Sequence, residues 1–258
     1  MNAAQRQYYA SAGLNLLLRA KNFLGWAQMR CVACLEPFSI QDCLAKEPFI
    51  ALCPDCRARV PRRNTGYCPY CGEPAQNENA ELLPCGACLE SRPPWRNFRF
   101  YGIFANLLRQ ILLKGKYGND MASLELLGRF LLLACVDLEQ PDAIVPMPLH
   151  SSRLKERGYN QSREISRPLA RRLDCPINDG WLYRIIPTTP QTGLPRNKRL
   201  QNLNGAFAAN EQVAGRHILL VDDTATTCAS LKAAVNALLV AGAATVDVTV
   251  VARASQFE

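Results

Sequence analysis

The residues best suited to chemistry lie between positions 218 and 230, where an apolar run meets two carboxylates and a threonine-rich loop. The run Ile-Leu-Leu-Val predicts a buried strand that ends in Asp222 and Asp223, and Thr-Ala-Thr-Thr-Cys then leads into a predicted helix. Loop amides, hydroxyl groups and a helix N-terminus bind phosphate, and paired carboxylates accept hydrogen bonds from neighbouring sugar hydroxyls. The pattern therefore predicts a ribose 5-phosphate site. The alternative is a strand end followed by an ordinary threonine cap without a ligand.

Cysteine spacing indicates a second kind of chemistry, metal binding. Two residues between thiolates place both sulfurs on one side of a tight turn, and two such turns complete a tetrahedral sulfur shell suited to zinc. We therefore expect two structural zinc sites, since four thiolates leave no open position for a substrate. Pairing of consecutive turns is the simplest chain path, although spacing leaves a crossed pairing open, and an iron–sulfur cluster is the competing interpretation. The eight ligands are Cys31, Cys34, Cys53, Cys56, Cys68, Cys71, Cys85 and Cys88.

Positive charge is unevenly distributed along the chain. The formal net charge is +8, and residues 151–200 hold 11 Lys/Arg against 4 Asp/Glu. Such an excess predicts an anionic partner, with a solvated basic face as the alternative. Arginines interleaved with rings suit single-stranded nucleic acid, unless the rings pack on the main domain. The candidate nucleic-acid residues are Arg92, Trp95, Arg96 and Arg99 in one strip and Arg163, Arg167, Arg171 and Arg172 on a predicted helix.

The elements that must position these residues follow from apolar periodicity. We expect a helical segment at 1–30, a double zinc ribbon at 31–90, a basic and aromatic linker at 91–101, and an α/β domain at 102–258. Within that domain, strand, helix and strand at 217–221, 229–240 and 245–251 form a right-handed crossover of a parallel sheet. The remaining expected elements are helices at 103–113, 121–138 and 162–173, the last kinked or started late by Pro168, and a strand at 143–147.

Hydropathy argues against a membrane protein. No apolar run reaches the roughly 18 residues that a spanning helix needs; the best candidate, Leu126–Val136, contains Arg129. The apolar stretch Leu14–Leu18 is too short for a signal peptide. We therefore expect a cytoplasmic protein without membrane insertion, in which twelve cysteines favour metal binding over disulfides. The unpaired Cys43, Cys135 and Cys175 are expected to be buried fillers.

Further motifs accompany the Asp-Asp segment. With them, the chain resembles the type I phosphoribosyltransferases and, more narrowly, the ComF family of competence-associated, phosphoribosyltransferase-like proteins (the ComFC and GntX group). The resemblance covers nearly the whole chain after residue 30, and Arg-Gly-Tyr-Asn-Gln is its most discriminating part. The motifs are Lys116-Tyr-Gly118, Val145-Pro-Met-Pro-Leu-His150, Arg157-Gly-Tyr-Asn-Gln-Ser162, Thr189 with Gln191, Arg199 to Asn204, and Gly205-Ala-Phe207.

The resemblance implies a parallel sheet with helices on both faces and a phosphoribosyl pyrophosphate (PRPP) site with Mg²⁺ bridging the pyrophosphate oxygens. Asp222 and Asp223, the catalytic carboxylates, would hold the ribose hydroxyls. The reaction would displace pyrophosphate at the anomeric carbon, mainly by positioning and charge neutralisation. The 5-phosphate would be wrapped by Thr224, Ala225, Thr226, Thr227 and Cys228. The pyrophosphate and substrate side would comprise Pro148, Leu149, His150, Arg153, Arg157, Asn160 and Gln161.

Cys228 departs from the family pattern, which usually has glycine in this loop position. A side chain disfavours positive φ by about 1 kcal/mol or more, so PRPP binding is better supported than turnover by this glycosyltransferase-type site. Alternatively, Cys228 is a thiol whose pKa is lowered at a helix N-terminus.

Three functions remain open from the sequence. The leading hypothesis is a ComF-like protein that binds PRPP and Mg²⁺ and handles single-stranded DNA during natural transformation, with other DNA-uptake proteins as partners. The second is an active phosphoribosyltransferase that acts on an unidentified acceptor. The third is a non-catalytic, nucleotide-sensing module that binds DNA or a protein.

Overall fold

A computed structural model describes residues 28–40, 48–185 and 205–255. The helix expected over 1–30 therefore lies almost entirely outside the described residues. The chain divides into two compact units, Met1–Val60 and Pro61–Glu258. The division falls inside the segment expected to be one double zinc ribbon, so each unit carries one four-cysteine group.

The smaller unit is organised around two short strands. β1 (Gln28–Arg30) pairs antiparallel with β2 (Pro37–Ser39). Cys31 follows β1 directly, and its backbone N–H donates to the Glu36 carbonyl at 3.0 Å. α3 (Pro54–Ala58) begins after Cys53, whose sulfur accepts a hydrogen bond from the Cys56 N–H at 3.5 Å. These turns place the cysteines where a metal would bind.

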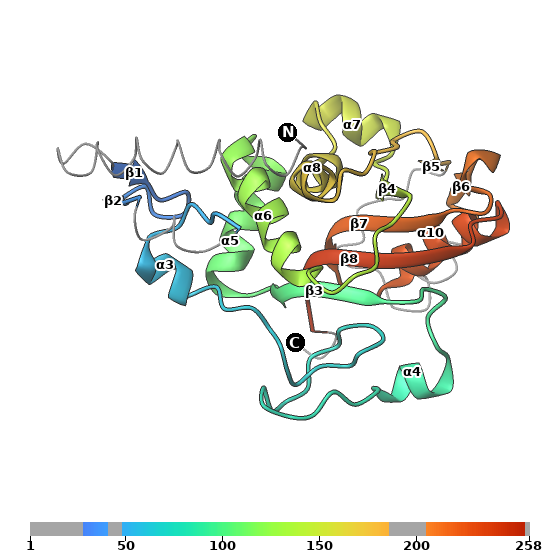
Figure 1. Ribbon diagram of the computed structural model, residues 1–258, viewed down its shortest axis with the longest axis horizontal. Coiled ribbons are helices and arrows are strands. Elements are labelled where there is room, and N and C mark those ends of the chain that lie inside the picture. Colours follow the sequence, from blue (N-terminus) through green and yellow to red (C-terminus); the bar gives the residue numbers. More distant parts are fainter. Residues whose placement is uncertain (1–27, 41–47, 186–204, 256–258) are drawn as a thin grey trace, which may run out of the picture. The chain divides into compact units, whose positions relative to one another are not determined.

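The larger unit contains a sheet of four parallel strands in the order β3-β8-β7-β4 (Figure 1). Two expectations need correction. Pairing with β8 continues to the last residue of β7, so this strand runs past Asp222 and Asp223 instead of ending there. Part of the expected linker is the edge strand β3. The strands are β3 (Phe98–Ile103), β4 (Ala143–Pro146), β7 (His217–Ala225) and β8 (Thr245–Arg253).

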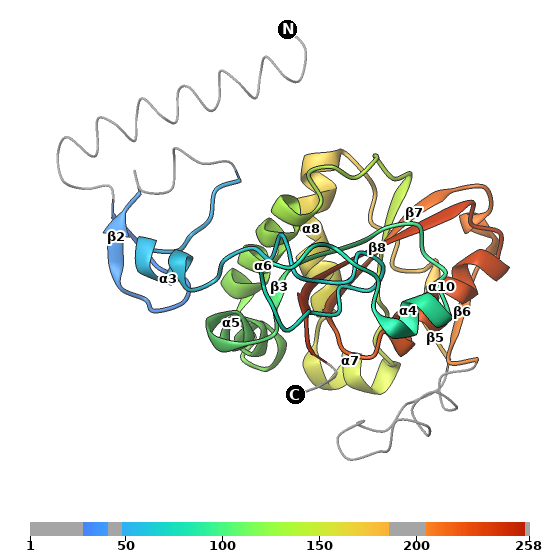
Figure 2. The ribbon, with the colours of Figure 1, turned by 90° about the horizontal axis from the view of Figure 1, so that it is seen from below.

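Helices cover the sheet on both faces, which confirms the predicted fold class. α6 (Met121–Ala134) packs on β3 and β8, and α8 (Gln161–Leu173) packs on β7 and β4. α10 (Ala229–Val240) contacts β8 from the other face, where its buried Leu231 and Leu238 join the core with Ile218. Figure 2 shows α5 (Asn106–Tyr117), α6 and α8 grouped together, away from α10.

Close contact between α6 and α8 depends on Gly128. A Cβ on this glycine would lie 2.6 Å from Pro168 Cγ and 2.5 Å from the Ile165 carbonyl oxygen. Pro168 lies in the middle of α8, which nevertheless begins at Gln161, so the expected late start is wrong. The shorter elements of the unit are α4 (Gly86–Glu90), α7 (Ser151–Arg157), β5 (Leu182–Arg184), β6 (Phe207–Ala209) and the 3₁₀ turn Glu211–Val213.

The second four-cysteine group is part of this unit's hydrophobic core. Cys68, Cys71 and Cys88 are buried in one cluster with Phe98 and Phe100 of β3. The contact is close, because a Cβ on the intervening Gly72 would lie 2.6 Å from the Phe98 ring. The segment that carries this cysteine group therefore packs directly on the sheet.

A charged cluster lies where β7 and β8 begin. Asp247 is 1% exposed and accepts hydrogen bonds from Arg96 at 2.8 Å and from the Asn97 backbone at 3.1 Å. His217 Nε2 lies 2.8 Å from the same carboxylate, which agrees with a structural role for this histidine. Among the described residues, no helix is both long and apolar enough to span a membrane.

Candidate functional site

The candidate site lies where β4 and β7 end, side by side in the sheet. After β4 the chain continues to α8 on one face, and after β7 it continues to α10 on the other. Ligands of open parallel sheets bind at such a point, beyond the carboxyl ends of the strands. The topology therefore places the Asp-Asp segment at the position that a ligand would occupy.

Asp222 and Asp223 are held by side chains from two helices. Ser162 Oγ, in the first turn of α8, donates to Asp222 Oδ1 at 3.0 Å. Gln161 Nε2 donates to Asp223 Oδ2 at 3.3 Å, and Lys116 Nζ of α5 forms an ion pair with the same oxygen at 3.0 Å. The carboxylates are thus fixed in place before any ligand arrives.

The proximity of the two carboxyl groups sets their charge. Burial, followed by repulsion from Asp223, raises the pKa of Asp222 to about 7. The pKa of the Lys116 ammonium group is raised as well, because attraction to Asp223 favours its charged form. Near neutral pH Asp222 is therefore only partly ionised, beside a positively charged Lys116.

The motif Arg157–Ser162 links this region together. Gly158 ends α7 with a φ of +81°, a left-handed conformation that favours glycine. Tyr159 OH donates to the Gly115 carbonyl at 2.5 Å, which attaches the motif to α5 one residue before Lys116. Arg157 donates to Gln161 Oε1 and so orients the amide that reaches Asp223.

Asn160 joins the ends of two segments. Its Nδ2 donates to the Met147 carbonyl just after β4, at 3.1 Å. Its Oδ1 accepts from the Ser162 N–H at 3.0 Å and caps α8. The cap fixes the helix start that presents Gln161 and Ser162 to the carboxylates.

The loop Thr226–Cys228 connects β7 to α10. Thr227 Oγ1 accepts from the Ala229 N–H at 3.4 Å, so Thr227 helps to cap the helix. Cys228 has a φ of +57°, the left-handed conformation that a glycine would adopt without strain. Thr226 is exposed and Thr224 is half-buried. The loop therefore stands at the N-terminus of α10.

The alternative role for Cys228 as a reactive thiol is wrong. The side chain is 5% exposed, and burial raises its pKa to about 11. Its sulfur faces the Cys71 carbonyl oxygen at 3.9 Å. A thiol with these surroundings stays protonated and is poorly accessible to reagents.

The proposed pyrophosphate side follows β4. Pro148, Leu149 and His150 are half-buried there, and His150 Nδ1 accepts from the Ser152 N–H at 3.3 Å, which caps α7. The half-buried Arg153 lies in the first turn of the same helix. Arg157 packs over the exposed Tyr117 ring, 5.4 Å from its centroid.

Sequence reasoning missed two cations at the site. Lys116 belonged to a motif, but no sequence feature indicated that it would contact Asp223. Arg184 of β5 interacts electrostatically with residues of the site. Burial and the positive charge of Arg153 lower the pKa of its guanidinium, and the smaller opposing effect of Asp222 raises it. No pattern indicated Arg184, because it stands in a segment that appeared to be loop. The motif residues Thr189, Gln191 and 199–204 lie outside the described residues.

Both cysteine groups fit a tetrahedral metal. In each group, the four sulfurs lie within 4.8 Å of one another. Sulfur–sulfur distances of 3.8 Å for Cys34–Cys53 and 3.7 Å for Cys71–Cys85 match the ~3.8 Å expected for Zn–S bonds of about 2.3 Å. The first group joins the first and second pairs and the second joins the third and fourth, which confirms consecutive pairing. Cys135 and Cys175 are buried, as expected, and Cys43 lies outside the described residues.

The first candidate nucleic-acid strip does not face solvent as a stacking surface. Trp95 is 7% exposed and donates its indole N–H to the Tyr70 carbonyl at 2.7 Å, so its ring is not available to a base. Arg96 pairs with Asp247 at 2.8 Å, and Arg99 pairs with Asp137 at 3.0 Å. The interpretation that these aromatic rings pack on the domain is the one the structure supports.

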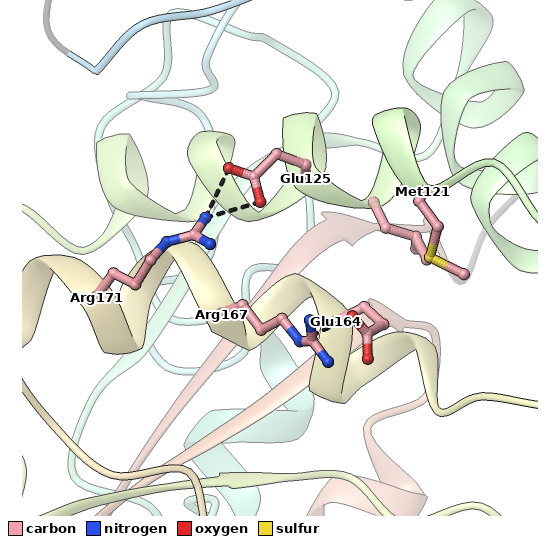
Figure 3. A pocket seen from close by; sticks show the side chains of 6 residues that line it. Met121, Glu125, Glu164, Arg167 and Arg171 are labelled. Atoms are coloured by element: carbon pink, nitrogen blue, oxygen red, sulfur yellow. Dashed lines mark hydrogen bonds and ion pairs between the residues drawn. The ribbon is translucent and has the colours of Figure 1, made fainter.

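The arginines of α8 are also largely paired with acids. Arg163 forms an ion pair with Asp179, Arg167 with Glu164 at 2.9 Å, and Arg171 with Glu125 at 2.7 Å. The last two line a hollow of about 250 Å³ between α6 and α8 (Figure 3). Arg172 and Arg92 are exposed, and Arg92 lies over the Tyr70 ring. Within the described residues, this helix face is much closer to neutral than its arginine content suggests.

Comparison with known proteins identifies the family. No family model matches the chain. It is 34% identical to the DNA utilization protein YhgH of Escherichia coli K12 over 203 residues, covering 76% of this chain and 88% of that protein. It is 31% identical to competence protein F of Haemophilus influenzae over 217 residues, covering 81% and 90%. The chain belongs to the ComF family.

A more distant ComF-family relative spans most of the chain as well. The competence protein ComFC of Bacillus subtilis is 26% identical over 233 residues, which cover 85% of this chain and 92% of that protein. Among solved structures, TT1426 from Thermus thermophilus has a TM-score of 0.31 at 16% identity, over 52% of this chain and 82% of that one. A score this low adds nothing to the assignment of this ComF-family chain.

Proposed function

We propose that this chain binds PRPP with Mg²⁺ at the carboxyl end of β7 and handles single-stranded DNA in the cytoplasm during natural transformation. One observation carries the ligand: Asp222 and Asp223, oriented by three side chains, stand beside a loop that ends in a left-handed residue at a helix N-terminus. The names of the relatives from Haemophilus influenzae and Bacillus subtilis, both competence proteins, support the process.

The two halves of the site suit the two ends of the ligand. The backbone amides of Thr226–Cys228, with the N-terminus of α10, would hold the 5-phosphate. Asp222 and Asp223 would accept hydrogen bonds from the ribose hydroxyls. Lys116, Arg153 and Arg184 would then neutralise the pyrophosphate that leaves the anomeric carbon.

Mg²⁺ fits this arrangement, because it prefers oxygen ligands and is usually bound through one or two carboxylates together with substrate phosphates. When bound, it would neutralise charge on the pyrophosphate. The protein's own contribution is positional: Gln161 and Ser162 orient the carboxylates, and Lys116 balances their charge.

Turnover is a second candidate function. The cations near Asp222 would favour departure of pyrophosphate, which supports an active phosphoribosyltransferase acting on an unidentified acceptor. Cys228 works against this, since a side chain at a φ of +57° costs about 1 kcal/mol or more relative to glycine and restricts how closely the loop approaches a phosphate. A non-catalytic, nucleotide-sensing module is the third candidate.

Titration calorimetry with PRPP and Mg²⁺ tests the site. We expect saturable binding that falls at least tenfold in Asp222→Asn and Asp223→Asn, and little change in the matched control Asp179→Asn, an exposed aspartate that pairs with Arg163. Absence of binding by the unmodified chain would refute the proposal. Pyrophosphate release with a panel of bases and amines separates turnover from binding alone.

The DNA role needs its own measurement. A gel shift with single-stranded DNA should weaken steeply as salt rises, because phosphate contacts release counterions. The shift should persist in Arg171→Ala, since that guanidinium already pairs with Glu125, and should weaken in Arg172→Ala. Absence of a salt-sensitive shift would refute the DNA role.

A further inference from the structure

Arg253, the last residue of β8, is fully buried behind the loop Thr226–Cys228. Its guanidinium reaches two segments that lie far apart in the sequence. Nε donates to the Cys71 carbonyl at 2.8 Å, and Nη1 donates to the Ala225 carbonyl at 3.3 Å. Cys71 belongs to the second cysteine group, and Ala225 immediately precedes the loop. One side chain thus joins a metal ligand's backbone to the start of the loop.

The other end of the loop meets the same carbonyl group. Cys228 Sγ lies 3.9 Å from the Cys71 oxygen that accepts from Arg253. Both the residue before the loop and its last residue are therefore attached to one peptide unit of the second cysteine group. That peptide unit therefore contacts both ends of the loop, directly at Cys228 and through Arg253 at Ala225.

Charge neutralisation keeps Arg253 in place. Nη2 forms an ion pair with Glu73, two residues after Cys71, and this carboxylate is 6% exposed. A buried guanidinium is strongly unfavourable without its partner. Glu73 therefore makes the buried position of Arg253 possible, and it does so from the same turn that supplies Cys71.

We propose that Arg253 is a positioning residue that makes the geometry of the loop Thr226–Cys228 depend on metal binding at the second cysteine group. A metal bound by Cys68, Cys71, Cys85 and Cys88 holds the turn at Cys71, and Arg253 transfers that position to the loop. The first cysteine group belongs to the other compact unit. The inference rests on the proposed function only where phosphate affinity is the readout.

Three variants distinguish loss of the connection between the second cysteine group and the loop from a general loss of stability. Arg253→Lys keeps the charge next to Glu73 but loses the fixed geometry that reaches both the Cys71 and Ala225 carbonyls. Cys85→Ser removes a half-buried ligand of the second group, and Cys34→Ser removes an exposed ligand of the first group as a matched control. Calorimetry with ribose 5-phosphate should show affinity reduced at least tenfold in Arg253→Lys and Cys85→Ser, and within twofold of the unmodified chain in Cys34→Ser.

Pyrophosphate with Mg²⁺ provides an internal comparison. The affinity of the chain for pyrophosphate should change less than threefold in all three variants, because pyrophosphate is not expected to contact the loop Thr226–Cys228. An equal loss for ribose 5-phosphate and pyrophosphate would indicate general damage and overturn the positioning role. An undiminished affinity for ribose 5-phosphate in Cys85→Ser would overturn the dependence on metal.

A second readout does not depend on ligand binding. The rate at which iodoacetamide alkylates Cys228, followed by peptide mass spectrometry, should rise at least fivefold in Arg253→Lys and Cys85→Ser but not in Cys34→Ser. If the unmodified chain fails to bind ribose 5-phosphate, the proposed function fails, while this rate still decides the inference. Equal alkylation rates of Cys228 in Cys85→Ser and Cys34→Ser would refute the inference. If Arg253→Lys folds poorly, this comparison of the two cysteine variants still tests the inference.

Discussion

Lys116 Nζ lies 3.0 Å from Asp223 Oδ2, although the two residues are far apart in the sequence. The ion pair connects the last turn of α5 to the carboxyl end of β7. It places a positive charge beside two neighbouring carboxylates at the point where an anionic ligand is expected. Its removal should therefore affect ligand binding more than folding.

Lys116→Met should weaken binding of PRPP with Mg²⁺ at least tenfold, because two uncompensated carboxylates repel the ligand's phosphates. The stability loss should be modest, about 1 kcal/mol, since the lysine side chain is 29% exposed and partly solvated. Calorimetry and urea denaturation measure the two effects. Lys155→Met, a change in an exposed lysine of α7, is the control. Unchanged affinity in Lys116→Met would show that the ion pair is only structural.

Binding should depend on pH through Asp222. With a pKa of about 7, its ionised fraction rises from about one tenth at pH 6 to about nine tenths at pH 8. Affinity for PRPP with Mg²⁺ should increase about fivefold to tenfold over that range, because only the carboxylate accepts from both ribose hydroxyls. Asp222→Asn should remove this component. Ser162→Ala should move the midpoint to higher pH, since the lost hydrogen bond favours the ionised form.

The same group makes an opposite contribution to stability. Its folded-state pKa lies above the unfolded value of about 3.9, so the folded chain binds more protons between about pH 4 and pH 7. Stability from this group should therefore fall as pH rises through that window and level off above it. Urea midpoints at pH 5 and pH 8 should differ less in Asp222→Asn than in the unmodified chain.

The backbone at Cys228 should determine which side chains the loop tolerates. At a φ of +57°, Cys228→Val should weaken ribose 5-phosphate binding at least tenfold, because a β-branched residue is strongly disfavoured there. Cys228→Gly should bind at least as tightly as the unmodified chain. Cys175→Val, in a buried cysteine of a different segment, controls for the change in volume. Equal binding by the Val and Gly variants would show that the loop is not strained.

Asp247 should stabilise the fold without affecting the site. Burial alone raises its pKa, but hydrogen bonds from Arg96 and His217 outweigh burial and lower it below the ordinary value. The stabilisation is thus fully present above about pH 4 and is lost as pH falls through the lower folded-state pKa. Asp247→Asn should cost about 2 kcal/mol at pH 7, a value reduced from that of a fully buried pair because Arg96 is 36% exposed.

The ligand affinity of Asp247→Asn should match that of the unmodified chain, because this cluster lies at the other end of the sheet. Glu139→Gln removes the exposed partner of Arg96 and should change stability by less than about 0.5 kcal/mol. Urea denaturation between pH 3 and pH 7 checks both variants. If the stability of Asp247→Asn fell as steeply between pH 7 and pH 3 as that of the unmodified chain, the stabilising role of ionised Asp247 would be contradicted.

Local patterns in the sequence were sufficient for the cysteine groups, the crossover unit and the loop before α10. Each of these depends on spacing within a short segment: two residues between thiolates, alternation in a strand, or helical periodicity. Apolar runs could not locate the end of β7, because its last residues are held by pairing with β8 and not by their own hydrophobicity. Nor could they show that the rings around Trp95 are buried, since composition does not reveal which face of a segment meets the core.

The sequence by itself determined which residue types this chain can bring to a ligand: two carboxylates, a threonine-rich turn, eight thiolates and an excess of arginine. Only the tertiary structure decided which of them meet. The order of the parallel strands brings Lys116 and Gln161 to Asp223, and it brings Arg253 to Cys71 across 182 positions. It also pairs most of the candidate arginines with acids. Such contacts depend on strand order and helix packing, and long-range packing leaves no periodic signal in the chain.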